Sequence, residues 1–254
     1  MRTILITGAS GGIGQALARM YATPGTYLIL QGRNQARLEA LAQVCRQQGA
    51  SVAIRDLDLS DNAALCQWMF TVCDTTPPDL VFVNAGVNTN MGLQYQGESL
   101  AAMNNLIEVN IRAAMTTVHM TLHSMRERGS GQIALISSLA GYYGLPMTPS
   151  YSASKAALKA YCEALRAGLA SEGIKINVVM PGYVDSDMCD AMPGPKPFRI
   201  SAKDAAQRIR RGLEKNQARI TFPFPLNLGC WLLAVMPPAL ASWLLKRLGY
   251  GLQH

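Results

Sequence analysis

Short apolar runs alternate with longer stretches of helical spacing along the first 180 residues. The apolar runs do not alternate with polar residues, which is typical of strands buried on both faces of a parallel sheet. The predicted strands are Thr3–Thr7, Tyr27–Gln31, Ser51–Arg55, Leu80–Asn84, Gln132–Ser137 and Lys175–Met180. The predicted helices between them are Asn34–Gln47, Asn62–Val72, Leu100–Arg128 and Ser150–Glu172. Repeated strand–helix–strand units predict an α/β fold with a doubly wound parallel sheet.

The last third of the chain departs from this pattern in two places. Pro193, Pro195 and Pro197 interrupt residues 185–200, so we expect a loop there rather than a regular element. A seventh strand is expected at Arg219–Phe222. We expect residues 1–222 to form one catalytic domain that includes the loop. Residues 223–254 are expected to add apolar helices to this single domain, as a hydrophobic and basic extension.

Composition narrows the class of protein. Of the 254 residues, 49% are hydrophobic and 15% are charged, which suits a buried core and excludes a disordered chain. The six cysteines form no CxxC pair, which disfavours a disulfide scaffold or a zinc module and favours the reduced thiols of the cytoplasm. A turn follows the first seven residues, too early for the apolar core of a signal peptide. The expected location is the cytoplasm.

The charge lies at one end of the chain. Residues 1–198 hold 14 Lys or Arg and 14 Asp or Glu, so the net charge of +7 comes from the last 56 residues. A neutral body with a basic, apolar tail favours an anionic surface and disfavours nucleic acid as a partner.

The tail is apolar but broken by prolines. Residues 220–245 carry no charge, and the longest piece without proline, Leu226–Met236, has 11 residues. As a helix it would span about 16 Å, against roughly 30 Å of membrane hydrocarbon, so it is not a transmembrane helix. Two alternatives stay open. Short helices could cover the active site or form a subunit contact, or the tail could lie on a membrane as a cation-rimmed apolar surface. The first is favoured, because apolar stretches of this length are more often core.

A glycine-rich turn follows the first strand. It reads Thr7-Gly8-Ala9-Ser10-Gly11-Gly12-Ile13-Gly14 and leads into a helix. Glycines in such a turn bring main-chain N–H groups close to a pyrophosphate, which the helix N-terminus favours electrostatically. The spacing of Gly8, Gly12 and Gly14 resembles the TGxxxGxG turn of classical short-chain dehydrogenases/reductases.

Other motifs of that family follow in order over roughly residues 2–215. Asp58-Leu59 is similar to the pair that holds the adenine, and Asn84-Ala85-Gly86 resembles the NAG motif. Pro181-Gly182-Tyr183-Val184-Asp185-Ser186 resembles the PGxVxT segment beside the nicotinamide, with Ser in place of Thr. Asn110, Ser138, Tyr151 and Lys155 match the catalytic tetrad. The resemblance implies cofactor contacts from Gly8, Ser10, Gly12, Ile13, Gly14, Asp58, Leu59, Asn84, Ala85, Gly86, Tyr151, Lys155, Pro181, Gly182, Val184 and Ser186.

The end of the second strand indicates which dinucleotide is bound. NAD-preferring sites place a carboxylate there to accept hydrogen bonds from the ribose hydroxyl. Here the chain reads Leu30-Gln31-Gly32-Arg33, with no carboxylate and with a guanidinium suited to a phosphate. NADP(H) is therefore favoured over NAD(H), with Arg33 as a cofactor-binding residue.

The tetrad carries the chemistry. Tyr151 and Lys155 are four residues apart and share one helix face. An ammonium group together with an oxidised nicotinamide would lower the phenol pKa from its usual value of about 10. The resemblance implies that Tyr151 is the general acid for carbonyl reduction, or the base for alcohol oxidation, and that Lys155 also holds the nicotinamide ribose. Ser138 would position the substrate oxygen, and Asn110 would hold a water that links Lys155 to solvent. Ser137 is the alternative to Ser138, but the spacing to Tyr151 favours Ser138.

We expect no metal site, since His119 and His123 share a helix face without the third ligand that catalytic zinc needs. The predicted function is NADP(H)-preferring reduction of a carbonyl, or oxidation of the alcohol, in an apolar small-molecule substrate. The expected assembly is a homo-oligomer, a dimer, with a peripheral membrane contact through the tail left open. The alternatives are an NAD-linked alcohol dehydrogenase and a non-catalytic dinucleotide-sensing protein of the same fold.

Overall fold

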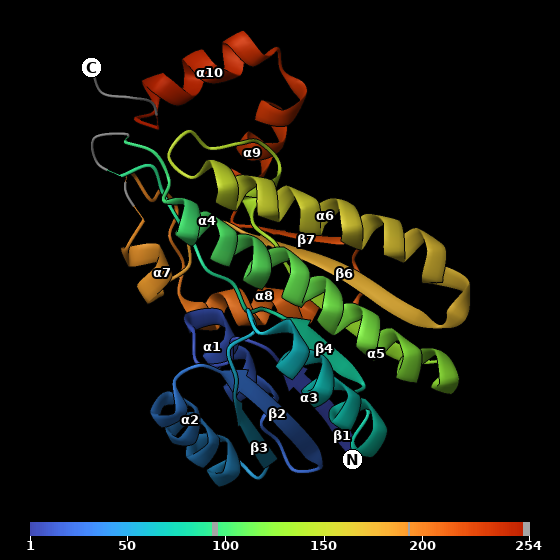
Figure 1. Ribbon diagram of the computed structural model, residues 1–254. Coiled ribbons are helices and arrows are strands. Elements are labelled where there is room, and N and C mark those ends of the chain that lie inside the picture. The colour runs from blue at the N-terminus through green and yellow to red at the C-terminus, as the bar shows by residue number, and fades with distance from the viewer. Residues whose placement is uncertain (93–95, 193, 251–254) are drawn as a thin grey trace.

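A seven-stranded sheet runs through the centre of the computed structural model, which describes residues 1–92, 96–192 and 194–250 (Figure 1). The strands are β1 (Arg2–Ile6), β2 (Thr26–Gly32), β3 (Ser51–Asp56), β4 (Leu80–Val83), β5 (Gly131–Ile136), β6 (Ile174–Pro181) and β7 (Arg219–Phe222). Their order in the sheet is β3-β2-β1-β4-β5-β6-β7, and every neighbouring pair is parallel. The predicted fold class is confirmed, and no strand end differs from its predicted position by more than one residue.

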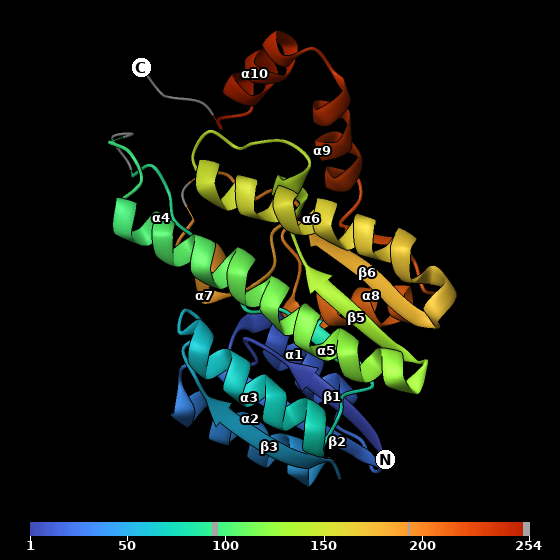
Figure 2. The ribbon, with the colours of Figure 1, turned by 45° about the vertical axis from the view of Figure 1, so that its right-hand side comes forward.

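Helices cover both faces of the sheet. The helices are α1 (Gly12–Tyr21), α2 (Gln35–Gln47), α3 (Asn62–Thr75), α4 (Leu100–Ile107), α5 (Ala114–Arg128), α6 (Pro149–Leu169), α7 (Asp187–Asp190), α8 (Ala202–Glu214), α9 (Leu226–Val235) and α10 (Pro238–Arg247). The buried side chains of α1, α2 and α8 form one core layer with the sheet, and those of α3, α5 and α6 form the other (Figure 2). The two layers explain why the strands are apolar on both faces.

The strand order places one crevice at a defined point. β1 lies between β2 and β4, so the chain leaves β1 towards one half of the sheet and later continues in the other half. The connections diverge at the carboxyl ends of β1 and β4, where open α/β sheets bind their ligands. The glycine turn after β1 and the Asn84-Ala85-Gly86 segment after β4 both lie at this edge.

The predicted helix Leu100–Arg128 is interrupted. A π-helical turn, η1 (Glu108–Ala113), separates α4 from α5. Asn110 lies within this turn. Its side-chain amide accepts a hydrogen bond from the Val87 N–H and donates one to the Val87 carbonyl. Such turns occur mostly as single wide turns within α-helices, often at functional sites, and periodicity alone does not announce them.

The segment 185–200 is less irregular than the sequence predicts. It contains the short helix α7, which begins at Ser186, whose hydroxyl accepts a hydrogen bond from the Cys189 N–H at 3.1 Å. Val184 pairs with Ile200 in an isolated parallel bridge, so the two ends of the segment lie side by side. Of the three prolines in the prediction, Pro193 lies outside the described residues.

Helix α8 was not predicted. Its buried face holds Ala205, Ala206, Ile209, Gly212 and Leu213 at helical spacing, opposite a strongly charged face. Its capping signal is clear, because the Ser201 hydroxyl accepts a hydrogen bond from the Asp204 N–H at 3.0 Å.

The extension after β7 folds as two short helices, α9 and α10. Both figures show them stacked beyond the N-terminal end of α6, at the end of the molecule farthest from β3. The two helices pack on each other through the buried side chains of Leu233, Ala241 and Leu245. Residues 251–254 of the predicted extension lie outside the described part of the chain. Across the described ranges, no helix combines the length and the apolar character that crossing a membrane requires.

Two glycines near the end of α6 offer a matched test of backbone constraint. Gly173 has a φ of +72°, and an added Cβ would lie 2.3 Å from the carbonyl oxygen of Gly129. Gly168 lies within α6, and a Cβ there would meet no atom within 4 Å. Gly173→Ala should lower the free energy of unfolding by more than about 1 kcal/mol. Gly168→Ala should raise it by about 0.5 kcal/mol. Urea denaturation of both variants measures the difference, and equal effects would contradict the constraint at Gly173.

Candidate active site

One cavity of about 670 Å³ extends along the carboxyl edge of the sheet. It reaches from the glycine turn after β1 to the inner faces of α9 and α10. Every predicted site residue lines this cavity except Gly14 and Asn110. The motifs that the sequence carries at separate element ends therefore meet at one place.

The glycine turn is shaped by close approach of main-chain atoms. A Cβ at Gly14 would lie 2.4 Å from the Gly8 carbonyl oxygen, and a Cβ at Gly12 would lie 2.6 Å from that of Asp185. Gly8 itself has a φ of +64°. Helix α1 begins at Gly12 with no side-chain cap and no acidic residue in its first turn. Its first N–H groups thus remain for a ligand, and such an end fits the pyrophosphate of a dinucleotide.

A hydrogen-bond network joins the turn to the end of β4. The Thr7 hydroxyl accepts hydrogen bonds from the N–H groups of Asn84 and Ala85 at 3.0 and 3.1 Å, and donates to the Phe82 carbonyl at 3.3 Å. The Asn84 amide donates to the carbonyls of Thr7 and Gly8, both at 3.0 Å. The network holds the two diverging strand ends together, so Asn84 acts on the cofactor turn through the main chain.

Positive charge gathers where the cavity passes the ends of β2 and β3. Arg33 is exposed and lines the cavity there, and no carboxylate stands at the end of β2. Asp58 lines the same region. Hydrogen bonds from the N–H and hydroxyl of Ser60 lower the pKa of its carboxyl group, and Arg33 lowers it further.

The sequence analysis missed Arg37, which also lines this end of the cavity. Arg37 lies in the first turn of α2, and its guanidinium pairs with the Asp187 carboxylate of α7 at 2.7 Å. Its position, one helical turn after Arg33, is the signal that could have identified it. The pair joins the two segments that border the mouth of the cavity.

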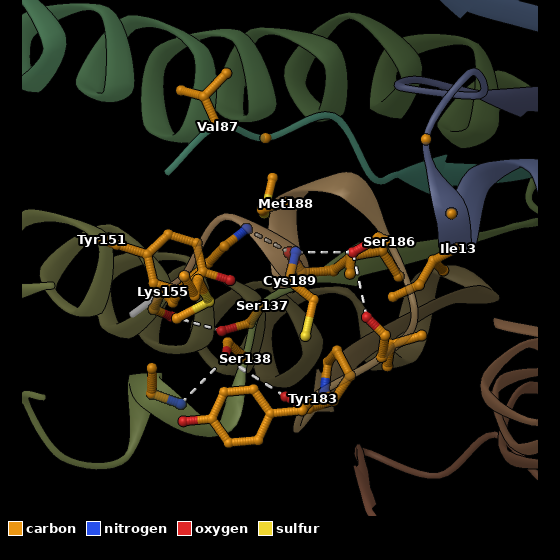
Figure 3. A pocket seen from close by; sticks show the side chains of 18 of the residues that line it. Ile13, Val87, Ser137, Ser138, Tyr151, Lys155, Tyr183, Ser186, Met188 and Cys189 are labelled. Atoms are coloured by element: carbon orange, nitrogen blue, oxygen red, sulfur yellow. Dashed lines mark hydrogen bonds between the residues drawn. The ribbon is translucent and has the colours of Figure 1, made fainter. Parts of the chain in front are cut away.

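The catalytic side chains come from α6 and from the end of β5. Tyr151 and Lys155 lie one turn apart, with Lys155 Nζ 5.5 Å from the centre of the phenol ring. Figure 3 shows these two side chains next to each other on one side of the pocket, with Ile13 and Ser186 on the other side. Lys155 Nζ donates to the Ile136 carbonyl at 3.0 Å, so two of its three protons remain for other acceptors.

The two serines after β5 have different partners. The Ser137 hydroxyl is buried and donates to the Lys155 carbonyl at 2.7 Å, which attaches α6 to the end of the strand. The Ser138 hydroxyl accepts from the Ala140 N–H at 3.2 Å, donates to the Pro181 carbonyl at 3.4 Å, and lies beside the Tyr151 hydroxyl, whose pKa it lowers. Only Ser138 therefore interacts directly with the phenol.

Burial dominates the protonation of the pair. It raises the pKa of Tyr151, while the hydrogen bond with Ser138 lowers it. Burial also lowers the pKa of Lys155 from 10.5 to about 8. Within the chain alone, burial is the largest influence on the pKa of both groups, and the lowering expected from the ammonium together with an oxidised nicotinamide stays a prediction.

The side-chain amide of Asn110 is held by protein partners, and the water expected beside this residue stays a prediction. It is fully buried, accepts from the Val87 N–H at 2.8 Å, and donates to the Val87 carbonyl at 2.9 Å and to the Ser154 hydroxyl at 3.1 Å. Both amide protons are therefore occupied by protein atoms. Asn110 is a positioning residue that holds the segment after β4 against α6.

The tail helices complete the cavity. A Cβ at Gly182 would lie 2.8 Å from a methyl carbon of Leu226, so the start of α9 packs directly on the segment after β6. Leu226, Leu233 and Leu245 line the cavity, which supports the interpretation that the tail covers the active site. The outward faces remain apolar and exposed, with Trp231 44% and Trp243 55% accessible.

Within the described residues, no three or more His, Cys, Asp or Glu side chains gather as metal ligands. Of the two histidines considered in the sequence, His123 lies 3.3 Å from the exposed Glu127 carboxylate.

Comparisons with known proteins agree with the geometry. The short chain dehydrogenase family matches residues 2–194. An uncharacterized oxidoreductase from Myxococcus xanthus is 32% identical over 249 residues, covering 97% of each chain. A short-chain dehydrogenase from Sphingobium yanoikuyae in complex with NADPH is similar in structure at 22% identity, with a TM-score of 0.83 over 100% of this chain and 99% of that one. An alcohol dehydrogenase from the archaeon Thermococcus sibiricus, complexed with 5-hydroxy-NADP, is 27% identical, with a TM-score of 0.76 over 87% and 96%. With this site at the carboxyl edge of a parallel sheet, the chain belongs to the short-chain dehydrogenase/reductase family and is an NAD(P)-dependent oxidoreductase.

Proposed function

We propose that the protein reduces the carbonyl group of an apolar small molecule with NADPH, and oxidises the corresponding alcohol in the reverse direction. The observation that carries this proposal is the single cavity that joins the glycine turn, the Tyr151–Ser138 pair and the apolar faces of α9 and α10. A cofactor on the glycine turn, the proton donor Tyr151 and an apolar substrate can thus meet within one cavity.

The cation at the end of β2 supports NADPH. Arg33 and Arg37 border the part of the cavity that a ribose 2′-phosphate would occupy if the pyrophosphate lay on the N-terminus of α1. A guanidinium offers a phosphate paired, charge-assisted hydrogen bonds. An NAD-linked dehydrogenase would instead use a carboxylate, and the end of β2 has none.

The residues of α6 and β5 suit the proton half of the reaction. When bound, a reduced nicotinamide supplies a hydride to the carbonyl carbon and becomes oxidised. Tyr151 Oη gives its proton to the carbonyl oxygen, so that the product is an alcohol. Ser138 Oγ donates a hydrogen bond to the same oxygen and orients it. Lys155 has two protons free to hold the ribose hydroxyls, and its ammonium stabilises the phenolate left on Tyr151 until solvent restores the proton.

An apolar substrate agrees with the lining beyond Tyr151. Leu145, Met188 and Leu226 line the cavity together with the catalytic residues. The dimer contact and the membrane contact of the outward tail faces stay predictions.

Tyr151→Phe should lower kcat for carbonyl reduction by about 10²- to 10⁴-fold, because only the transferable proton is removed. The dissociation constant for NADPH should change little. Loss of nicotinamide absorbance with a panel of ketones and aldehydes measures turnover, and fluorescence titration measures binding. Turnover retained by the variant would remove Tyr151 from the mechanism. No NADPH oxidation by the wild type with any carbonyl would favour the dinucleotide-sensing alternative.

Lys155→Met should abolish turnover and yet stabilise the fold at pH 7. The folded-state pKa of about 8 lies below the unfolded value of 10.5, so the unfolded state binds the extra proton between these values. Burying the ammonium below pH 8 therefore costs about 3 kcal/mol. Allowing about 1 kcal/mol for the lost hydrogen bond to Ile136, the variant should gain about 2 kcal/mol.

The gain of Lys155→Met should shrink as the pH rises from 8 to 10.5, because the wild type then folds with a neutral amine. Urea denaturation at pH 7 and pH 10 measures it. Lys159→Met, one turn further along α6 at a partly exposed position, is the control and should show no such pH dependence. A variant less stable than the wild type at pH 7 would contradict this account.

Arg33→Ala should raise the dissociation constant for NADPH roughly ten- to a hundredfold and leave that for NADH nearly unchanged. The effect should weaken at high salt, because Arg33 is exposed. Arg46→Ala, at the other end of α2, removes the same charge away from the cavity and is the control. Equal losses for both cofactors would show that Arg33 does not contact the 2′-phosphate.

A further inference from the structure

The far end of the cavity is an apolar branch, defined by Tyr143, Leu145, Leu226, Gly229, Leu233 and Leu244. No charged side chain lines this branch among the described residues. The charged groups of the cavity lie elsewhere, with Lys155 beside the phenol and Arg33, Arg37, Asp58 and Asp187 along the dinucleotide end. The branch thus offers no charged side chain to bind an ionic ligand.

The polar atoms nearest the branch are used by each other. The hydroxyls of Tyr183 and Tyr250 lie 3.4 Å apart, and the Tyr250 hydroxyl donates to the Pro195 carbonyl at 3.2 Å. Apart from the Tyr143 hydroxyl, the side chains that define the branch present carbon surface from aliphatic groups and an aromatic ring. Such a wall favours a ligand whose own surface is hydrocarbon.

The branch is elongated because a helical stripe forms one side of it. Leu226, Gly229 and Leu233 follow one face of α9, and Leu244 faces them from α10, with Leu248 directly after the end of that helix. Seven residues from Leu226 to Leu233 correspond to about 10 Å of helix. A stripe of this length along α9 suits a narrow ligand that extends beside the helix better than a compact ring.

Gly229 opens the middle of this stripe. It is the one glycine of α9, where helix propensity would favour almost any other residue. A Cβ at this position would meet no atom within 4 Å. The space beside α9 is therefore empty where the other residues of the stripe carry leucine.

We propose that the branch binds the straight hydrocarbon chain of the substrate, so that the enzyme acts on long-chain alkyl or acyl carbonyl compounds. The carbonyl end lies at Tyr151 and Ser138, and the chain runs past Leu226 between α9 and α10. This inference rests on the proposed function for the carbonyl end, while the chain site itself is independent of turnover.

Displacement of a fluorescent straight-chain polyene fatty acid by methyl ketones of increasing length tests the chain site directly. Affinity should rise about fourfold per added methylene until the branch is full. Gly229→Leu should abolish the dependence on length for the longer ketones and leave the binding of short ketones and NADPH unchanged. Ala234→Leu adds the same side chain at an exposed position of α9 that does not line the cavity, and should behave as the wild type.

A second measurement needs no variant. Cys230 lines the cavity beside Gly229, whereas Cys66 lies on α3 outside it. A saturating long-chain ketone should slow the alkylation of Cys230 by iodoacetamide at least tenfold and leave Cys66 unaffected, as read by peptide mass spectrometry.

The outcomes separate the two proposals. If Gly229→Leu retains the chain-length dependence, or if Cys230 is not protected, the chain site is overturned. If both measurements succeed but no long-chain ketone is reduced by the wild type with NADPH, the chain site stands and the proposed reaction fails.

Discussion

The attachment of α6 to the end of β5 is the interaction on which the catalytic geometry depends. Ser137 donates to the Lys155 carbonyl, and Lys155 donates through its side chain to the Ile136 carbonyl, so one residue is held from both ends. A Cβ at Gly141 would lie 2.8 Å from the same Lys155 carbonyl, which shows how closely the loop after β5 approaches the helix. Because Tyr151 lies one turn away on this helix, the phenol is located by the same contacts. A shift of α6 would therefore move the Tyr151 phenol and the Lys155 ammonium together, relative to Ser138 at the end of β5.

The central features of the fold could be predicted because they depend on local patterns. Apolar strands, turn glycines and the Tyr151–Lys155 spacing are each readable in a short window of sequence, and strand order then brings them together at one edge. The π-helical turn at Asn110 could not be predicted, because it depends on a pairing with Val87 that is distant in sequence. The same holds for Arg37, whose place at the cavity is set by how α2 and α7 pack. Helix α8, by contrast, could have been predicted, because Ala205, Ile209 and Gly212 recur at helical spacing opposite a charged face.

The structure of the tail could be predicted only in part. Its apolar composition and its prolines predicted short helices that do not span a membrane, but composition alone could not separate the inner face of each helix from the outer one. The structure separates them. Leu233 and Leu245 are buried, while Trp231 and Trp243 are exposed on the same two helices. The pocket is therefore formed by the carboxyl edge of the parallel sheet together with the inner faces of the two tail helices, α9 and α10.

The ion pair between Arg37 and Asp187 bears on how a dinucleotide could leave the cavity. It is the link between α2, beside the adenine end of the cavity, and α7, in the segment that covers the nicotinamide end. Both side chains are largely exposed, and pairs of this kind contribute about 0–1 kcal/mol. The Arg37–Asp187 ion pair can therefore break and re-form while the strands and helices stay folded. If α2 and α7 move apart to release a dinucleotide, this bridge would therefore add little to the energy of that movement.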